Sequence, residues 1–390
     1  MPTVFSRPAV RKDTLKTKGK LLKTPALKSG CETDGQPPKK NGQLKSIWYA
    51  SDCSGLDVGA LSLKRAGVKF RHWFASESDK GCRDVLHKIH DNVEVIFHDC
   101  RTKDLRRLKQ ERSQNPGVKL IYTSGFPCQP YSKAGSQQGE HDPRAGVVWS
   151  VIDTISALLP TVYILENVAD LAASGRYASV FQKIMQKLEN VGRGAYHIEW
   201  KIMDSFEFGA VPAKRNRVYV VGCLKCCMTG AWTWPGPIQP PSLDSILQPR
   251  KKDEKADIAS LSKTNLRNIA EGIRKIQEQS ESGASWKKQP WVIDCANSAT
   301  FGLRLSYNSF PTITKSHANS LWLVHKEDFA NETELLAGQG IKWSDLGVRA
   351  GSLPANKIGQ MVGNSFTLTI FVRLYQQIFP CLKIRMAKSK

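Results

Sequence analysis

The chain has 390 residues, which is long enough to bury one large hydrophobic core together with a smaller lobe. Its 57 Lys and Arg residues against 35 Asp and Glu residues give a net charge of +22, which favours a polyanionic partner. No apolar run reaches membrane-spanning length, no signal-peptide core is visible, and the 10 cysteines show no even spacing. We therefore expect neither a membrane protein nor a secreted disulfide scaffold, and the cysteine pattern favours a reducing compartment.

The first segment, residues 1–44, is rich in Lys, Thr, Pro and Gly and poor in aromatic residues, which predicts a disordered basic arm. Such an arm suits a nuclear or DNA-contacting tail, an organelle transit segment, or a solvated tail without a specific role. Of these locations we expect the nucleus.

From residue 45 onward, apolar strand candidates alternate with segments of helical spacing. The strands are expected at residues 47–50, 72–75, 93–97, 118–122, 161–165, 197–203 and 218–221. This alternation predicts an α/β fold for residues 45–225, with a doubly wound, mostly parallel sheet that carries helices on both faces.

The alternation breaks at residues 230–241, which are rich in Pro, Gly and Trp. Beyond this break the sequence predicts one amphipathic helix, and residues 291–323 are typical of short β segments. We therefore predict a second, smaller lobe at residues 226–354. The last segment, 355–390, contains an apolar helix at 365–379 that we expect to pack back onto the first domain.

A Gly-Phe-Pro-Cys-Gln-Pro run at residues 125–130 follows a buried strand. Ligands bind beyond the carboxyl ends of the strands in an open α/β sheet, so this turn directs Cys128 toward a candidate active site. Two prolines stiffen the backbone around the thiol, as suits a positioned nucleophile, although a cysteine at a strand end can equally be a small buried hydrophobic residue. Glu166 follows the next strand, and Arg215 with Arg217 leads into a later one.

The first strand-to-helix turn is Ser-Gly-Leu-Asp-Val-Gly at residues 54–59. A glycine there lets the backbone approach a ligand closely, and the helix N-terminus favours polar groups. Glu77 and Asp99 end the second and third strands, where an acid can meet ribose hydroxyls and an adenine edge. Each carboxylate alone is more often a helix cap, but two at successive strand ends favour a nucleoside ligand.

These elements occur in the same order in cytosine-C5 methyltransferases, and the chain resembles that family from about residue 46 to residue 379. The resemblance rests on Pro-Cys-Gln at 127–129, Glu-Asn-Val at 166–168, Arg-x-Arg at 215–217 and Gly-Asn-Ser at 363–365. It implies a Rossmann-like class I methyltransferase fold that binds S-adenosylmethionine. The residues that it assigns to this cofactor are Ser54, Gly55, Leu56, Glu77, Ser78, Asp99, Cys100, Pro127, Asn364 and Ser365.

Two departures from the usual pattern bring the chain closest to the animal de novo type within the family. Asp57 and Val58 stand where most members have a Gly-Gly pair. Ala213 stands where glutamine is usual, and alanine also appears in the de novo group. We expect the first change to alter the shape of the turn without changing the cofactor assignment, and the second to weaken a loop contact rather than the chemistry.

The resemblance also assigns catalytic roles: Cys128 is the nucleophile, Glu166 the acid, Arg217 a contact to the base and Arg215 a brace for the site. Cytosine C5 is a poor nucleophile, and a thiolate that adds to C6 would make C5 able to accept a methyl group. A stacked cytosine is out of reach, so the base must be flipped out of double-stranded DNA. The expected DNA contacts are Ser132, Lys133 and Arg144, on a glycine-containing loop at 130–146, and Lys315.

Two other functions stay open at this point. The same chemistry on RNA belongs to tRNA-modifying relatives, which usually have Pro-Pro-Cys-Gln and a Cys-Phe-Thr segment, whereas this chain has Phe126 before Pro127 and lacks that segment. A catalytically inactive DNA-binding regulator would be expected to lose the cysteine or the acid, and both are present. Zinc binding by Cys223, Cys226 and Cys227 is not expected, because no second Cys/His pair lies at zinc-finger spacing.

Overall fold

The computed structural model describes residues 47–127, 146–173, 175, 177–250, 258–280, 285–296 and 302–387. The chain divides into two units, residues 1–43 and residues 44–390, and all described residues belong to the second. The predicted basic arm lies outside the described residues. So do four predicted site residues, namely Cys128, Ser132, Lys133 and Arg144.

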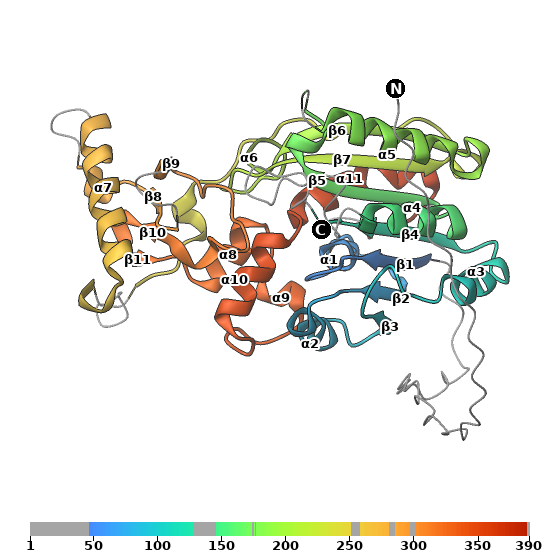
Figure 1. Ribbon diagram of the computed structural model, residues 1–390, viewed down its shortest axis with the longest axis horizontal. Helices are drawn as coiled ribbons and strands as arrows, with labels where there is room; N and C mark the ends of the chain where they lie inside the picture. The colour runs from blue at the N-terminus through green and yellow to red at the C-terminus, as the bar shows by residue number, and fades with distance from the viewer. Residues whose placement is uncertain are drawn as a thin grey trace, which may run out of the picture. The chain divides into compact units, whose positions relative to one another are not determined.

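A large sheet of seven strands runs in the order β3-β2-β1-β4-β5-β7-β6 (Figure 1). Its strands are β1 (Ile47–Asp52), β2 (Arg71–Ser76), β3 (Val93–Phe97), β4 (Lys119–Ser124), β5 (Val162–Val168), β6 (Tyr196–Asp204) and β7 (Asn216–Leu224). All pairs from β3 to β5 are parallel, while β7 is antiparallel to both β5 and β6. The predicted α/β fold with a mostly parallel sheet is therefore confirmed. The strand order reverses at β1 and β4, whose carboxyl ends are the usual ligand site in such sheets.

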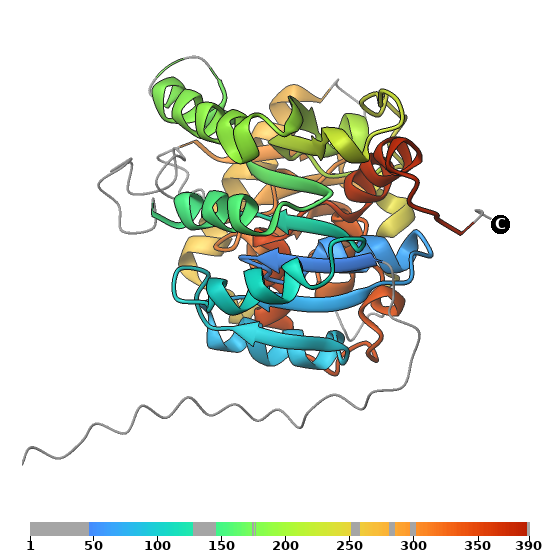
Figure 2. The ribbon, with the colours of Figure 1, turned by 90° about the vertical axis from the view of Figure 1, so that its right-hand side faces the viewer.

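Helices cover both faces of this sheet, so its central strands are buried along almost their whole length (Figures 1 and 2). One face packs against α1 (Val58–Arg65), α2 (Lys80–Ile89) and α11 (Leu368–Ile378). The other packs against α3 (Leu105–Ser113), α4 (Gly146–Leu158) and α5 (Ala178–Asn190). Asp79 and Asp104 begin α2 and α3 by accepting backbone N–H groups of the first turn. No helix in the described part of the chain is long and apolar enough to cross a bilayer.

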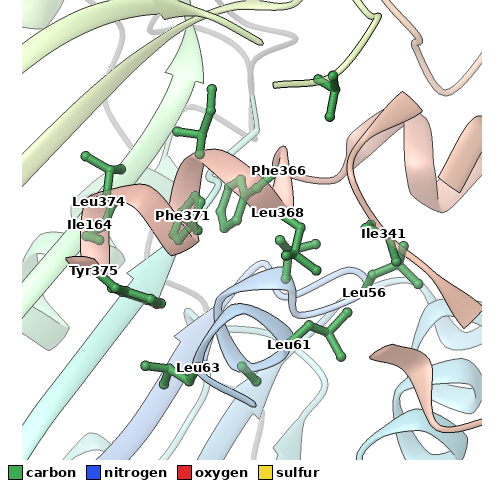
Figure 3. Close-up of a cluster of buried hydrophobic side chains, with 14 of the residues drawn as sticks. Leu56, Leu61, Leu63, Ile164, Ile341, Phe366, Leu368, Phe371, Leu374 and Tyr375 are labelled. Atoms are coloured by element: carbon green, nitrogen blue, oxygen red, sulfur yellow. The ribbon is translucent and has the colours of Figure 1, made fainter. Parts of the chain in front are cut away.

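The C-terminal segment packs against the first part of the chain. Leu368, Phe371 and Tyr375 of α11 share one hydrophobic cluster with Leu61 and Leu63 of α1, and Figure 3 shows these side chains meeting. Two hydrogen bonds reinforce the contact: the Ser62 hydroxyl donates to the Leu368 carbonyl at 3.2 Å, and the Tyr375 hydroxyl donates to the Gly59 carbonyl at 3.4 Å. A helix that is distant in sequence thus supports the helix that follows the first turn.

The final apolar helix, predicted at residues 365–379, does not begin at the Gly-Asn-Ser segment. Residues Ala355–Asn364 form a separate helix, α10, and α11 begins only at Leu368. Ser365 ends α10, because its backbone N–H and its hydroxyl both donate to the Val362 carbonyl, at 3.1 and 2.9 Å. A Cβ on Gly363 would lie 2.2 Å from the carbonyl carbon of Thr314, so this helix end meets another backbone directly.

A separate sheet of four strands runs in the order β11-β10-β8-β9, and all of its pairs are antiparallel. Its strands are β8 (Trp291–Asp294), β9 (Arg304–Tyr307), β10 (Leu321–Leu323) and β11 (Asp328–Phe329). Helix α7 (Lys263–Gln279) packs on this sheet, where a Cβ on Gly272 would lie 2.7 Å from the side chain of Ile293. Three shorter α-helices complete the described part of the fold. The helix α6 (Ser205–Phe208) lies between β6 and β7 in the chain, and α8 (Glu332–Gly338) and α9 (Trp343–Leu346) follow β11.

Candidate active site

Glu166 lies inside β5 and not after it, because the strand continues to Val168. Its antiparallel pairing with β7 places Glu166 opposite Tyr219 and Val168 opposite Arg217. The Arg217 Nε atom is 3.0 Å from the Glu166 Oε1 atom, and an Arg215 guanidinium nitrogen is 4.0 Å from the same oxygen. Glu166 is only 6% exposed, so this carboxylate is buried beside two guanidinium groups.

The two arginines have different surroundings. Arg215 is 3% exposed and donates to the backbone carbonyls of Ile313 at 3.0 Å and Gly363 at 3.3 Å. Arg217 donates to the carbonyl of Asn216 at 2.7 Å and lies closer to the carboxylate. Arg215 therefore joins the end of α10 and residue 313 to the site, which is the geometry that a brace requires, whereas Arg217 is the cation nearest to Glu166.

The segment leading into Cys128 lies against Glu166 and its neighbour. The Asn167 side-chain amide donates to the Phe126 carbonyl at 3.1 Å. A Cβ on Gly125 would lie 2.5 Å from the Phe366 ring and 3.6 Å from the Glu166 Oε2 atom, so only glycine allows this close approach. The chain is thus held beside Glu166 up to Pro127, which is half-buried, while Cys128 lies outside the described residues.

The first turn and the end of β2 are joined by hydrogen bonds. The Ser54 backbone N–H donates to the Ser76 carbonyl at 2.9 Å, and the Gly55 N–H donates to the Glu77 carboxylate at 2.9 Å. The other Glu77 oxygen accepts the Asp79 N–H at 2.9 Å. Gly55 has a φ of +53°, and a Cβ there would meet nothing within 4 Å. The turn therefore presents an open backbone cradle beside a carboxylate, as a nucleoside-containing ligand needs.

Asp57 has a structural role that the sequence interpretation missed. It is 1% exposed, and its carboxylate accepts the Tyr49 hydroxyl at 2.5 Å and the Ser51 hydroxyl at 2.9 Å. The His72 Nε2 atom lies 3.0 Å from it. Burial is the largest single effect and raises the pKa of Asp57, but the contacts with His72, His90 and Tyr49 together outweigh it, so that the pKa is lowered. Polar residues inside the apolar strands β1 and β2 were the available signal for this network.

Asp99, predicted to end the third strand, lies beyond the end of that strand. β3 ends at Phe97, so Asp99 follows it by two residues, and the Asp99 carboxylate accepts the Arg101 guanidinium at 2.6 Å. This hydrogen bond holds the pKa of Asp99 below its ordinary value. Cys100 is 7% exposed and lies next to Cys53, whose thiol pKa is raised by their hydrogen bond and by burial.

The remaining predicted residues lie around the start of α2 and the end of α10. Ser78 and Asn364 are exposed, and Ser365 is buried. Lys357 of α10 donates to Asp79 at 2.9 Å, and this hydrogen bond lowers the pKa of Asp79 to about 2. Lys315, predicted to contact DNA, has its Nζ atom 4.0 Å from the same carboxylate. Lys315 therefore lies on the side of the cofactor candidates.

Leu56 is fully buried beneath the first turn, and the His90 ring nitrogen Nε2 lies 3.1 Å from its carbonyl oxygen. Among the described ranges there is no group of three or more His, Cys, Asp or Glu side chains that could hold a metal ion. Cys223 is completely buried and Cys226 is exposed, so these two thiols face different surroundings.

Comparison with known proteins places residues 50–322 in the sequence family described as C-5 cytosine-specific DNA methylase. The Type II methyltransferase M.PspPI of Psychrobacter sp. is 33% identical over 196 residues, which are 50% of this chain and 42% of that protein. The Type II methyltransferase M.HaeII of Haemophilus aegyptius is 36% identical over 167 residues, which are 43% of this chain and 48% of that protein. The chain thus spans about half the length of the curated relatives it matches.

Solved structures share the fold at low sequence identity. The Entamoeba histolytica methyltransferase EhMeth superposes with a TM-score of 0.57 at 14% identity, over 86% of this chain and 98% of that one. At this identity the likeness concerns the fold alone.

Proposed function

The chain belongs to the C-5 cytosine-specific DNA methylases, and on that basis we propose that it transfers a methyl group from S-adenosylmethionine to C5 of cytosine in double-stranded DNA. The observation that supports this most strongly is the buried Glu166 carboxylate, 3.0 Å from Arg217 and beside the segment that leads into Cys128. An acid, cationic donors and a cysteine are the residue types that addition to a cytosine ring requires.

The residues that would hold S-adenosylmethionine are the Ser54–Gly55 turn, Glu77 and the segment at Asp99 and Cys100. When bound, the cofactor supplies a methyl group on a positively charged sulfur. The open space at Gly55 lets a ligand approach the backbone. Each Glu77 oxygen accepts one backbone N–H and keeps a second lone pair, so the carboxylate can also accept from ribose hydroxyls.

In the proposed reaction the Cys128 thiolate adds to C6 of a flipped-out cytosine, and a new S–C6 bond forms while the electron pair of the C5–C6 double bond moves to C5. Glu166 hydrogen-bonds or protonates N3, and Arg217 donates to the base, so that the negative charge on the ring is stabilised. C5 would then form a bond to the methyl group, while the sulfur–methyl bond of the donor would break and leave its electron pair on a neutral sulfur. Loss of the C5 proton to a base restores the double bond and expels the thiolate, which regenerates the enzyme.

One methyl-transfer assay distinguishes a DNA substrate from an RNA substrate. The purified protein is incubated with tritiated S-adenosylmethionine and, separately, with unmethylated duplex DNA and with tRNA. We expect label in DNA and background counts in RNA. Label in tRNA alone would identify an RNA enzyme, and label in neither, with cofactor and DNA binding both measured, would identify an inactive regulator. The nuclear location and the role of residues 1–44 stay predictions from the sequence.

Glu77→Ala should raise the KM for S-adenosylmethionine while leaving DNA affinity nearly unchanged. The ribose hydroxyls would lose a charged acceptor, and the Gly55 and Asp79 N–H groups would lose theirs as well. The expected loss is about 1–3 kcal/mol, the range for removing a hydrogen-bonding partner of this kind. Isothermal calorimetry with the cofactor and fluorescence anisotropy with DNA separate the two affinities. A variant that bound DNA weakly and the cofactor normally would mean that the cofactor had been assigned to the wrong strand end.

A further inference from the structure

Beneath the candidate cofactor residues lies a buried ion pair, Asp52–Lys103, that neither the proposed chemistry nor the family motifs use. Asp52 is the last residue of β1 and is completely buried, and its carboxylate accepts the Lys103 ammonium group. The same carboxylate accepts the Tyr122 hydroxyl at 2.6 Å and the Ser76 hydroxyl at 2.7 Å. One side chain thus connects the carboxyl ends of β1, β2 and β4.

Lys103 comes from the loop between β3 and α3, and its side chain is only 2% exposed. Because β2 lies between β3 and β1 in the sheet, the loop and the lysine side chain together cross the end of β2 to contact Asp52. Its Nζ atom lies 5.6 Å from the centre of the Phe74 ring of β2, a cation–π contact along this path. The contact therefore ties the loop to strands that are not its sheet neighbours.

Three residues of this network, Asp52, Ser76 and Lys103, lie next to or close to the candidate cofactor residues along the chain. Asp52 directly precedes Cys53 and the Ser54–Gly55 turn, and Ser76 directly precedes Glu77. Lys103 closes the loop that carries Asp99 and Cys100, in which the Thr102 N–H donates to the Asp99 carbonyl at 3.2 Å. A shift of Lys103 would move this loop relative to the other two strand ends.

Stability alone is a poor explanation for such a pair. Removing two charges from water is costly, and replacing a buried ion pair by uncharged side chains of similar volume is often neutral or stabilising. Removing only one partner is different, because it leaves an uncompensated buried charge. The contacts that the charged pair adds are directional, and they join the loop to the strand ends in one arrangement.

We propose that Asp52 and Lys103 are positioning residues for cofactor binding, which hold the 98–104 loop against the ends of β1 and β2 in the arrangement that accepts the adenosine part of the methyl donor. This inference rests on the proposed function. Neither residue has to touch the cofactor, and neither takes part in the chemistry at the cytosine ring. Their effect should therefore be on cofactor affinity and not on the rate of methyl transfer once the cofactor is bound.

The test uses the uncharged double variant Asp52→Asn/Lys103→Met, in the full-length protein. We expect a thermal midpoint close to that of the wild type, since no unpaired charge remains. The Kd for S-adenosylmethionine, measured by calorimetry, should rise on the order of tenfold, because the loop would no longer be held in its binding arrangement. A change of about tenfold corresponds to the free energy that a single hydrogen bond typically contributes. The kcat at saturating cofactor should stay within about threefold of wild type, because neither residue takes part in the transfer step and its activation barrier should be nearly unchanged. Lys109→Met, at an exposed lysine of α3, is the matched control and should change none of these values.

Two results would overturn the inference. A folded double variant that binds the cofactor as tightly as wild type would show that the loop does not need the ion pair for its position. A double variant that fails to fold would show that the pair serves stability instead. A wild-type protein with no measurable affinity for S-adenosylmethionine would contradict the proposed function itself, and calorimetry on the wild type separates this failure from the other two.

Discussion

Cys128→Ser is expected to lower methyl transfer by about 10³-fold or more, while the Kd for S-adenosylmethionine stays close to that of the wild type. The size of this loss follows the effect of removing an enzyme's covalent nucleophile. A serine hydroxyl is far less acidic than a thiol, so almost none of it is ionised at neutral pH, and it adds poorly to C6 of cytosine. Single-turnover incorporation of a labelled methyl group measures the loss, and turnover within tenfold of wild type would contradict the covalent mechanism.

A trapping experiment with the same variant tests the proposed bond directly. DNA that contains 5-fluorocytosine cannot lose a proton from C5, so the methylated adduct cannot resolve. Wild-type protein should form a complex with this DNA that survives denaturing electrophoresis, in the presence of S-adenosylmethionine. The complex should be missing with Cys128→Ser, and its absence with the wild type under conditions of proven DNA binding would favour the inactive regulator.

Glu166→Gln is expected to lower kcat by about 10²–10⁴-fold, the usual contribution of a positioned general acid. The amide keeps the shape of the side chain but cannot deliver a proton to N3 of the cytosine. Rapid-quench measurement of the transfer step isolates this effect from cofactor and DNA binding. Glu189→Gln, at an exposed glutamate of α5, is the control and should behave as wild type.

The same substitution has a structural consequence that must be measured alongside the rate. Arg217 lies 3.0 Å from Glu166, and Arg215 is 3% exposed, so the variant leaves buried cations without their carboxylate. Losing one partner of a buried pair costs about 3–5 kcal/mol of stability in other proteins. Thermal unfolding should therefore show a lower midpoint. A folded variant with wild-type kcat would remove Glu166 from the mechanism.

The inner strands of the large sheet could be predicted from the sequence because each is a short apolar run that is buried along almost its whole length. Their ends could not be predicted equally well. Glu166 follows the last residue of the predicted strand, yet it lies inside β5, because pairing with β7 extends that strand to Val168. This pairing joins residues about fifty positions apart, and hydrophobic periodicity carries no information about such partners.

Other features depend on contacts between distant segments. The end of α10 at Asn364 is set by the Ser365 hydrogen bonds and by the close approach of Gly363 to Thr314, neither of which leaves a local signal. The network around Asp52 is equally hidden, because a charged residue at a strand end is more often exposed than buried. The ordered motifs, by contrast, identified Glu166 and both arginines, and the structure brings these three side chains together.

The most direct test of the central claim is the chemical identity of the product. Unmethylated duplex DNA is incubated with the purified protein and S-adenosylmethionine, digested to nucleosides and examined by mass spectrometry against authentic standards. We predict 5-methyldeoxycytidine that accumulates with time, requires the cofactor and disappears with Cys128→Ser. DNA that contains only N4-methyldeoxycytidine, or no methylated cytidine although cofactor and DNA both bind, would contradict the assignment of this protein as a DNA cytosine-C5 methyltransferase.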